Sequence, residues 1–183
     1  MRELSLHILD IAQNAIAAGA SLIEITAAAD TAAHTLSVCI ADNGCGMTEE
    51  QVRRVLDPFY TTRTTRKVGM GVPLFKMAAE QTGGHLEIRS EVGVGTTVNA
   101  VFYTDHLDCI PLGDMASSVS TLLCMNADRR FIYRHRVDAA EFLLDTDTLR
   151  EILGDVPLSD SAVMQWLRAY LQENIEALYG GVT

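Results

Sequence analysis

The sequence Asp-Asn-Gly-Cys-Gly at residues 42–46 interrupts the apolar pattern of the chain more sharply than any other segment. It directly follows apolar residues 36–41, which predict a strand. The segment must therefore form a loop. Glycine lets a backbone approach a ligand closely, and an aspartate at a strand end can accept a hydrogen bond from an exocyclic amine. This pattern fits either an ordinary strand-ending turn or one wall of a binding site.

The hydrophobic periodicity around this loop predicts alternating helices and strands. Gly19 stops the first helix, Thr48-Glu-Glu-Gln forms a capping box for the second, and Gly83-Gly84 closes the third. The expected helices are 3–18, 48–56 and 72–81, and the expected strands are 23–29, 36–41, 85–89 and 96–103. This order predicts an α/β fold: a two-layer sandwich with a mixed, largely antiparallel sheet and helices on one face.

Residues 105–183 form a C-terminal α/β extension in this interpretation, and residues 1–104 form the first domain. Pro111 marks a plausible boundary. The expected helices of the extension are 113–125, 146–153 and 159–178, and its expected strands are 130–136 and 139–144. From residue 104 onward the chain holds 13 acidic and 6 basic side chains. The role of the extension is open, with partner docking as one hypothesis.

Four polar side chains share one face of the first predicted helix. Glu3, His7, Asp10 and Asn14 are spaced by four, three and four residues, which places them on one stripe. One interpretation is a solvated helix face. The alternative is that a carboxylate one turn before a carboxamide holds a water or a metal ion, and oxygen donors of this kind suit Mg²⁺.

A basic segment precedes the third predicted helix. Residues 58–79 contain Arg63, Arg66, Lys67 and Lys76 and no acidic residue, in a chain of net charge −10. Gly69 and Gly71 lie just before the helix, whose free N–H groups favour phosphate. The segment is a candidate anion site, although it matches neither a Walker A loop nor a dinucleotide-binding loop.

Taken in order, these motifs resemble the GHKL ATPases, the superfamily of gyrase-type topoisomerases, ninety-kilodalton heat-shock chaperones, histidine kinases and MutL proteins. The motifs are Asp-x-x-x-Asn, Asp-x-Gly-x-Gly-Met, Pro-Phe-Tyr-Thr-Thr and Gly-x-Gly-Val-x-Leu, within residues 3–103. The closing Gly-Gly-His-Leu-Glu-Ile-Arg-Ser segment, with Gly-Val-Gly-Thr-Thr after it, is similar to a histidine-kinase catalytic domain. The resemblance implies a Bergerat-type sandwich that binds ATP with Mg²⁺.

The resemblance also implies roles for individual residues. Asn14 would coordinate Mg²⁺, and Asp42 would accept a hydrogen bond from the adenine amine. The remaining implied nucleotide-binding residues are Gly44, Gly46 and Met47 in the loop, Phe59 as lid anchor, Gly69, Gly71 and Val72 at the phosphates, and Thr96 or Thr97 near the adenine. Arg63 and Lys67 are added from their charge and position.

Two departures from the family pattern bear on turnover. Val72 and Pro73 replace the usual Leu-Gly of the second glycine box, and Asp10 stands where glutamate is usual. Asp10 and Asn14 are the predicted catalytic residues.

The favoured function is a stand-alone, histidine-kinase-type domain that phosphorylates a histidine or serine of a partner protein in trans. The alternatives are a conformational ATPase, with Asp10 as general base on water, and a non-catalytic ATP sensor.

Charge and hydropathy limit the partners. The net charge of −10 argues against a duplex-DNA binder, which needs clustered Lys and Arg. The sequence has neither a run of about 18 apolar residues nor a secretory signal pattern at its start. We therefore expect a cytoplasmic signalling protein that binds ATP and a protein partner, but neither nucleic acid nor a membrane; a homodimer is left open.

Overall fold

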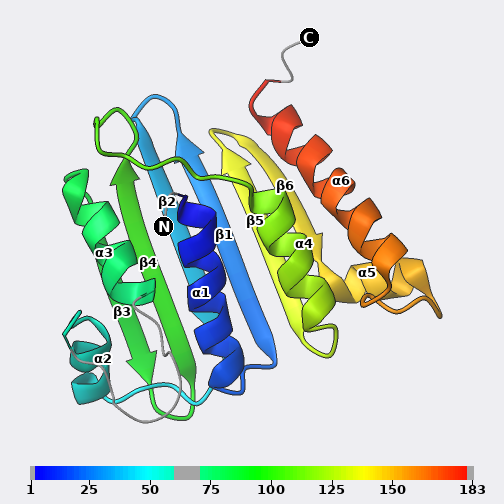
Figure 1. Cartoon of the computed structure of the whole chain (residues 1–183), viewed down its shortest axis with the longest axis horizontal. Helices are drawn as coiled ribbons and strands as arrows, with labels where there is room; N and C mark the ends of the chain where they lie inside the picture. Colours follow the sequence, from blue (N-terminus) through cyan, green and yellow to red (C-terminus); the bar gives the residue numbers. More distant parts are fainter. Residues whose placement is uncertain (1–2, 60–70, 181–183) are drawn as a thin grey trace.

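The computed structural model describes residues 3–59 and 71–180. Six strands form one sheet in the order β3-β4-β2-β1-β5-β6, and four longer helices cover one of its faces (Figure 1). The strands are β1 Leu22–Asp30, β2 Thr35–Asp42, β3 His85–Glu91, β4 Gly95–Tyr103, β5 Arg130–Val137 and β6 Ala140–Asp145. The helices are α1 Leu4–Ala17, α2 Glu49–Val55, α3 Gly71–Gln81, α4 Met115–Met125, α5 Thr146–Leu153 and α6 Ser161–Leu178. The predicted α/β sandwich is confirmed.

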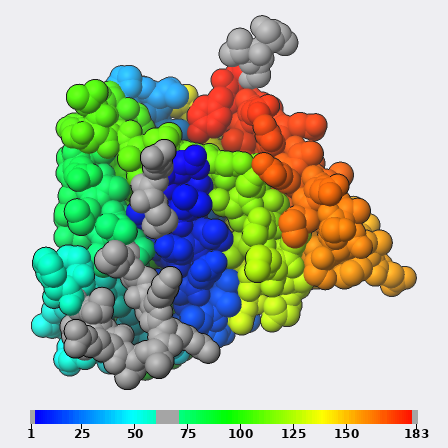
Figure 2. All heavy atoms as spheres, in the orientation of Figure 1, coloured from blue at the N-terminus to red at the C-terminus, as the bar shows by residue number. Residues whose placement is uncertain are grey.

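Helix α1 is the central element of the helical layer. Leu4, Ile8, Ile11 and Ala15 repeat at helical spacing and are all buried. The helix ends where Gly19 adopts a φ of +77°, a conformation that glycine takes without steric cost. In the space-filling view of Figure 2, α1 lies between α3 and α4, and its buried side chains join theirs in one core cluster.

The sheet contains one parallel ladder among antiparallel ones. β1 pairs antiparallel with β2, placing Ile25 opposite Ile40, and parallel with β5, placing Ile25 opposite Tyr133. All three side chains are buried beneath the helices. The sheet and its core thus continue from the N-terminal into the C-terminal part of the chain. The division into domains at residue 104 stays a prediction.

Helix α2 shows how closely local signals determine one element. Thr48 accepts a hydrogen bond from the Gln51 N–H at 3.2 Å, and the Gln51 side chain accepts one from the Thr48 N–H at 2.8 Å. The predicted capping box is confirmed. Across the described residues, no helix combines the length and apolar character needed to cross a bilayer.

Candidate functional site

A cavity of about 430 Å³ opens between the end of α1, the loop after β2, and helices α2 and α3. Strands β2, β3 and β4 supply its floor through Ile40, Ile88, Thr96 and Val98. The cavity is of the size that small organic ligands occupy, roughly 300–1,000 Å³. The predicted site residues that line it are Asn14, Asp42, Gly46, Met47, Val72 and Thr96.

The four residues of the polar stripe on α1 each have different surroundings. Asn14 lines the cavity together with the small side chains of Ala17 and Ala18. His7 is buried and stacks on Phe75, with 5.7 Å between the ring centroids. Burial disfavours the charged form of the imidazole, and this desolvation is the main reason that the pKa of His7 is lowered. The stripe is therefore not one solvated face.

Glu3 and Asp10, the two acids of the stripe, also lie apart. The Glu3 carboxylate accepts from the Asp114 N–H at 3.3 Å, far along the chain from the cavity motifs. Asp10 does not line the cavity but packs against the start of α3. A Cβ on Gly71 would stand 2.9 Å from the Asp10 Cβ, so glycine permits this close approach.

Asp42 ends β2 and lines the cavity. Its Oδ1 accepts a hydrogen bond from the Gly44 N–H at 2.8 Å. Burial raises the pKa of the Asp42 carboxyl, and hydrogen bonds from the Gly44 and Thr96 backbone partly oppose that shift. Gly44 is the buried residue of the loop, and a Cβ there would lie 2.9 Å from both Asp42 Oδ1 and the Ala18 Cβ. Gly44 therefore shapes the loop without lining the cavity.

Gly46 has a specific steric role. Its φ is +67°, and a Cβ there would stand 1.9 Å from the carbonyl oxygen of Glu91. The following residue, Met47, donates its N–H to the Ser90 hydroxyl at 2.8 Å. That hydroxyl also lies 2.8 Å from the Thr96 hydroxyl. The loop is thus attached to β3 through Ser90, and through Ser90 to β4.

Two residues that support this loop were not found by sequence reasoning. Ser90 is recognisable only once β3 and β4 are aligned, because its partner Thr96 lies directly opposite in the register. Asn43 accepts hydrogen bonds from the Ser21 and Leu22 N–H groups, both at 2.9 Å. These partners lie 22 and 21 residues away along the chain, so the local turn signal of an asparagine, which concerns backbone two residues on, does not predict them.

Helix α2 and the two described residues that line the cavity after it were not predicted as binding residues, although Gln51 belongs to the predicted capping box and Pro58 to the Pro-Phe-Tyr-Thr-Thr motif. Gln51, Arg54 and Val55 of α2 line the cavity, with Asp57 and Pro58 after it. Arg54 brings a positive charge and pairs with Glu50. Cys45 also lines the cavity from the glycine loop.

Other predicted residues lie outside the cavity lining or outside the described part of the chain. The Phe59 side chain is 92% exposed and does not line the cavity. Thr97 neighbours Thr96 on β4, opposite Ala41 of β2, and does not line it either. Arg63, Lys67 and Gly69 fall outside the described residues.

The donor set fits a magnesium ion only in combination with a ligand. Within residues 3–59 and 71–180, no three His, Cys, Asp or Glu side chains gather as a metal site. Asn14 offers one amide oxygen at the cavity wall. Mg²⁺ commonly binds through one or two side chains plus substrate phosphates and waters, so Asn14 fits a phosphate-borne Mg²⁺ and not a resident metal centre.

Comparison with known proteins covers the part of the chain that lines the cavity. A family model described as histidine kinase-, DNA gyrase B-, and HSP90-like ATPase matches residues 2–106. A sensor protein of Shewanella frigidimarina is 34% identical over 64 residues, covering 34% of this chain and 10% of that protein. Sensor protein SrrB of Staphylococcus aureus is 43% identical over 63 residues, covering 32% of this chain and 11% of its own length. The similarity thus spans about a tenth of these relatives.

Proposed function

Because the chain belongs to the histidine kinase-, DNA gyrase B- and HSP90-like ATPase family, we propose that it binds Mg-ATP in the 430 Å³ cavity and phosphorylates a partner protein in trans. The acceptor would be a histidine or serine side chain, and the setting would be cytoplasmic signalling. The observation that supports this most is the Asp42 carboxylate, held toward the cavity beside Thr96 by the glycine loop.

Asp42 would recognise the adenine base. A carboxylate accepts a hydrogen bond from an exocyclic amine, and such a charge-assisted bond is stronger than a neutral one. The apolar floor formed by Ile40, Ile88 and Val98 would contact the faces of the ring. Because Gly44 and Ser90 fix the loop at both ends, the pocket is organised before nucleotide binds.

The triphosphate would extend toward α3 and the end of α1. Backbone N–H groups at a helix N-terminus favour phosphate, and α3 begins at Gly71, against Asp10. Asn14 would hold Mg²⁺ through its amide oxygen, and the ion would neutralise phosphate charge when bound. Phosphoryl transfer needs positioning and charge neutralisation more than covalent chemistry, so Asp10 would act by orienting or deprotonating the acceptor.

A second candidate function is a conformational ATPase, favoured by the location of Asp10. Its carboxyl packs against the first residue of α3 outside the cavity lining, where an attacking water could lie between Asp10 and a terminal phosphate. In that case Asp10 would serve as general base on water. Nucleotide would then change the shape of the protein, not its partner's phosphorylation.

The test is incubation with labelled ATP, Mg²⁺ and candidate partner proteins, scoring bound nucleotide, free phosphate and protein-bound phosphate separately. Transfer that exceeds free phosphate release supports the kinase proposal. Rapid partner-free release at several turnovers per second would favour the conformational ATPase. Absence of any nucleotide binding would contradict both.

A further inference from the structure

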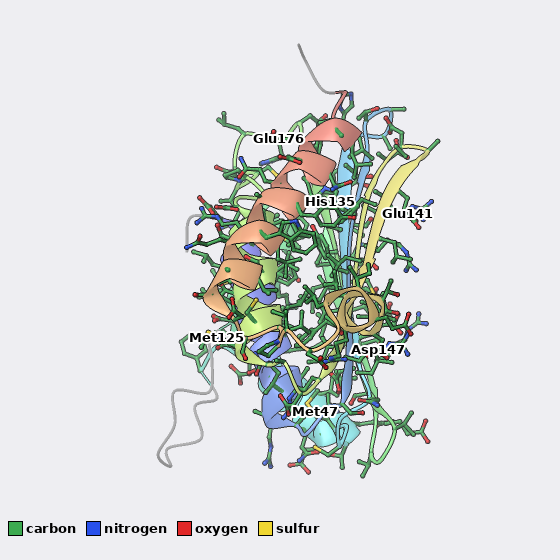
Figure 3. The ribbon with its side chains drawn as sticks, turned by 90° about the vertical axis from the view of Figure 1, so that its right-hand side faces the viewer. Met47, Met125, His135, Glu141, Asp147 and Glu176 are labelled. Carbon is green, nitrogen blue, oxygen red and sulfur yellow. The ribbon has the colours of Figure 1, made fainter. Side chains whose placement is uncertain are left out.

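A second cavity, of about 340 Å³, lies between the first turn of α4, strand β5 and the C-terminal half of α6. Figure 3 shows Glu176 and His135 toward one end of the molecule and Met47, which lines the first cavity, at the other end. The volume of the second cavity is also within the range of small-ligand sites, roughly 300–1,000 Å³. Nothing in the proposed ATP site uses it.

A chain of hydrogen bonds leads from the core to this cavity. His135 is fully buried, with Nδ1 2.6 Å from the Tyr133 hydroxyl and Nε2 3.1 Å from the Tyr179 hydroxyl. Within the described residues the Tyr133 hydroxyl has no other partner, and if it only accepted from Nδ1–H its own buried O–H would lack an acceptor. We therefore infer that it donates to Nδ1 and that Nε2–H donates to Tyr179. The Tyr179 hydroxyl oxygen accepts from Nε2–H and has further acceptor capacity, so a donor group in the cavity can bond to it.

The charged groups that line the cavity are both carboxylates. Asp114 is already engaged by Ser117 and by Arg168. Glu176 accepts one hydrogen bond, from the Gln172 amide at 2.9 Å, and has further acceptor capacity. His135 adds no positive charge, because burial lowers its pKa to about 4. The cavity therefore favours a cation.

The cavity lining also includes apolar side chains. Met115 and Ala116 of α4 are buried at the cavity base, and Ile175 of α6 is half-buried beside them. A ligand that satisfies both surfaces carries one positive head group and a short hydrocarbon part. The net charge of the chain, −10, adds a long-range attraction for such a molecule.

The segment that leads into the second cavity is hydrogen-bonded to the first turn of α1. The Leu4 N–H donates to the Pro111 carbonyl at 3.0 Å, and the Ser5 N–H donates to the Leu112 carbonyl at 2.8 Å. Gly113 is pressed against Glu3, so that a Cβ there would lie 2.4 Å from the Glu3 carboxylate. Figure 1 shows α1 running from this segment toward the loop after β2, and its far end carries Asn14 of the first cavity.

We propose that this second cavity binds a small organic ammonium ion, with Glu176 and Tyr179 at its head group, and that α1 transmits its occupancy to the nucleotide cavity. The head group donates to the Glu176 carboxylate, and Met115 and Ile175 contact the hydrocarbon part. The binding half of this proposal is independent of the proposed ATPase function, whereas the coupling half rests on it.

The binding test titrates nucleotide-free protein with hexylammonium, hexanol and hexanoate, which share a chain length and differ in head-group charge. We expect hexylammonium to bind at least tenfold more tightly than hexanol, and hexanoate to bind more weakly still. Glu176 is exposed, and an exposed ion pair contributes up to about 1 kcal/mol, so Glu176→Gln should weaken hexylammonium binding roughly fivefold. Glu173→Gln removes the same charge from the same helix outside the cavity lining and should change affinity less than about twofold.

Two results would overturn the binding half: equal affinity for hexylammonium and hexanol, or equal weakening by Glu176→Gln and Glu173→Gln. The second would mean attraction to the acidic surface alone. For the coupling half, saturating hexylammonium should change ATP affinity by about fivefold or more in the parent, and Glu176→Gln should need correspondingly more hexylammonium to reach the same change. Unchanged ATP affinity in the parent would overturn coupling. A failure of ATP to bind at all would contradict the proposed function. The titration of nucleotide-free protein would still decide whether hexylammonium binds in the second cavity.

Discussion

The two cavities differ in where their polar strand residue stands, at the end of a strand or within one. In the nucleotide cavity, Asp42 stands at the end of a strand, and glycines let the following loop fold back on it. In the second cavity, His135 stands within β5, fully buried, and two tyrosines satisfy its ring nitrogens. Strand-end polar groups keep access to solvent and ligand, whereas a polar group within a strand is a cost to folding unless it is fully bonded. We therefore expect changes in the first cavity to affect function, and changes around His135 to affect stability.

The largest expected effect is on turnover, in Asp10→Asn. The substitution keeps size and polarity but removes the base, so transfer to serine or hydrolysis should fall roughly 10²–10⁴-fold. ATP affinity and the free energy of unfolding should stay near the parent values. Single-turnover assays with labelled ATP would measure this, with Asp128→Asn, an exposed carboxyl of the loop after α4, as control. Transfer at the parent rate would remove Asp10 from the mechanism, except for a histidine acceptor, which is itself nucleophilic when neutral.

The next effect concerns acid stability and His135. Burial lowers its folded pKa to about 4, against about 6.5 in an unfolded chain. Between these values the unfolded state binds a proton that the folded state does not. The free energy of unfolding should therefore fall as pH drops from about 6.5 toward 4, by up to about 3 kcal/mol. Urea unfolding across this range would measure the slope, which should be smaller in His135→Gln; equal slopes in the two proteins would contradict the assignment.

Asp42→Asn should weaken ATP binding about 10- to 100-fold, because a hydrogen bond to a charged group contributes about 1.5–3 kcal/mol. Asparagine keeps an oxygen for the Gly44 N–H, so stability should change little. Calorimetry measures the affinity, with Asp128→Asn again as control. Since the Asp42 pKa is raised, parent affinity should also decline on acidification at a pH above the ordinary aspartate range. Unchanged affinity in a folded variant would remove Asp42 from adenine recognition.

The smallest expected effect is the loss of stability in Tyr133→Phe, which tests the hydrogen bonds around His135 beside the second cavity. Tyr133→Phe removes the hydroxyl that donates to His135 Nδ1 and leaves a buried acceptor without its partner, which costs about 1–3 kcal/mol. ATP affinity should be unchanged. Tyr170→Phe is the matched control, because Tyr170 stacks on Trp166 at the surface and should change stability by less than about 0.5 kcal/mol. Chemical unfolding of both variants distinguishes them; equal losses would contradict the hydrogen-bond chain.

The elements were largely predictable because their signals are local. The predicted helix over 146–153 coincides with α5, and α6 begins at Ser161, two residues later than predicted, because Asp160 caps it. Pairing between distant strands has no such signal, since β-ladder hydrogen bonds are made by any backbone. The parallel ladder between β1 and β5 was accordingly absent from the prediction.

The candidate site was predictable where residue type and spacing carry the chemistry. Asn14, Asp42 and Gly46 all line the cavity, and their catalytic and binding roles stay predictions. Ser90 was missed because a lone serine on a strand has no pattern until its neighbour across the ladder is known. The polar stripe was interpreted as one unit, yet helical spacing alone cannot tell that Phe75 and Asp114 lie against different parts of it.

The parallel pairing of β1 with β5 has a consequence for how the protein is made. β1 ends at Asp30, and its partner begins at Arg130, so about a hundred residues must be synthesised before one side of β1 can be covered. At a translation rate of about 5–20 residues per second, that backbone edge stays open for roughly 5–20 seconds on each nascent chain. An open edge is a template for pairing with other chains. A recombinant fragment that ends near residue 106, after the family-matched segment, would retain that edge permanently, and we expect it to self-associate even though every motif for nucleotide binding is present in it.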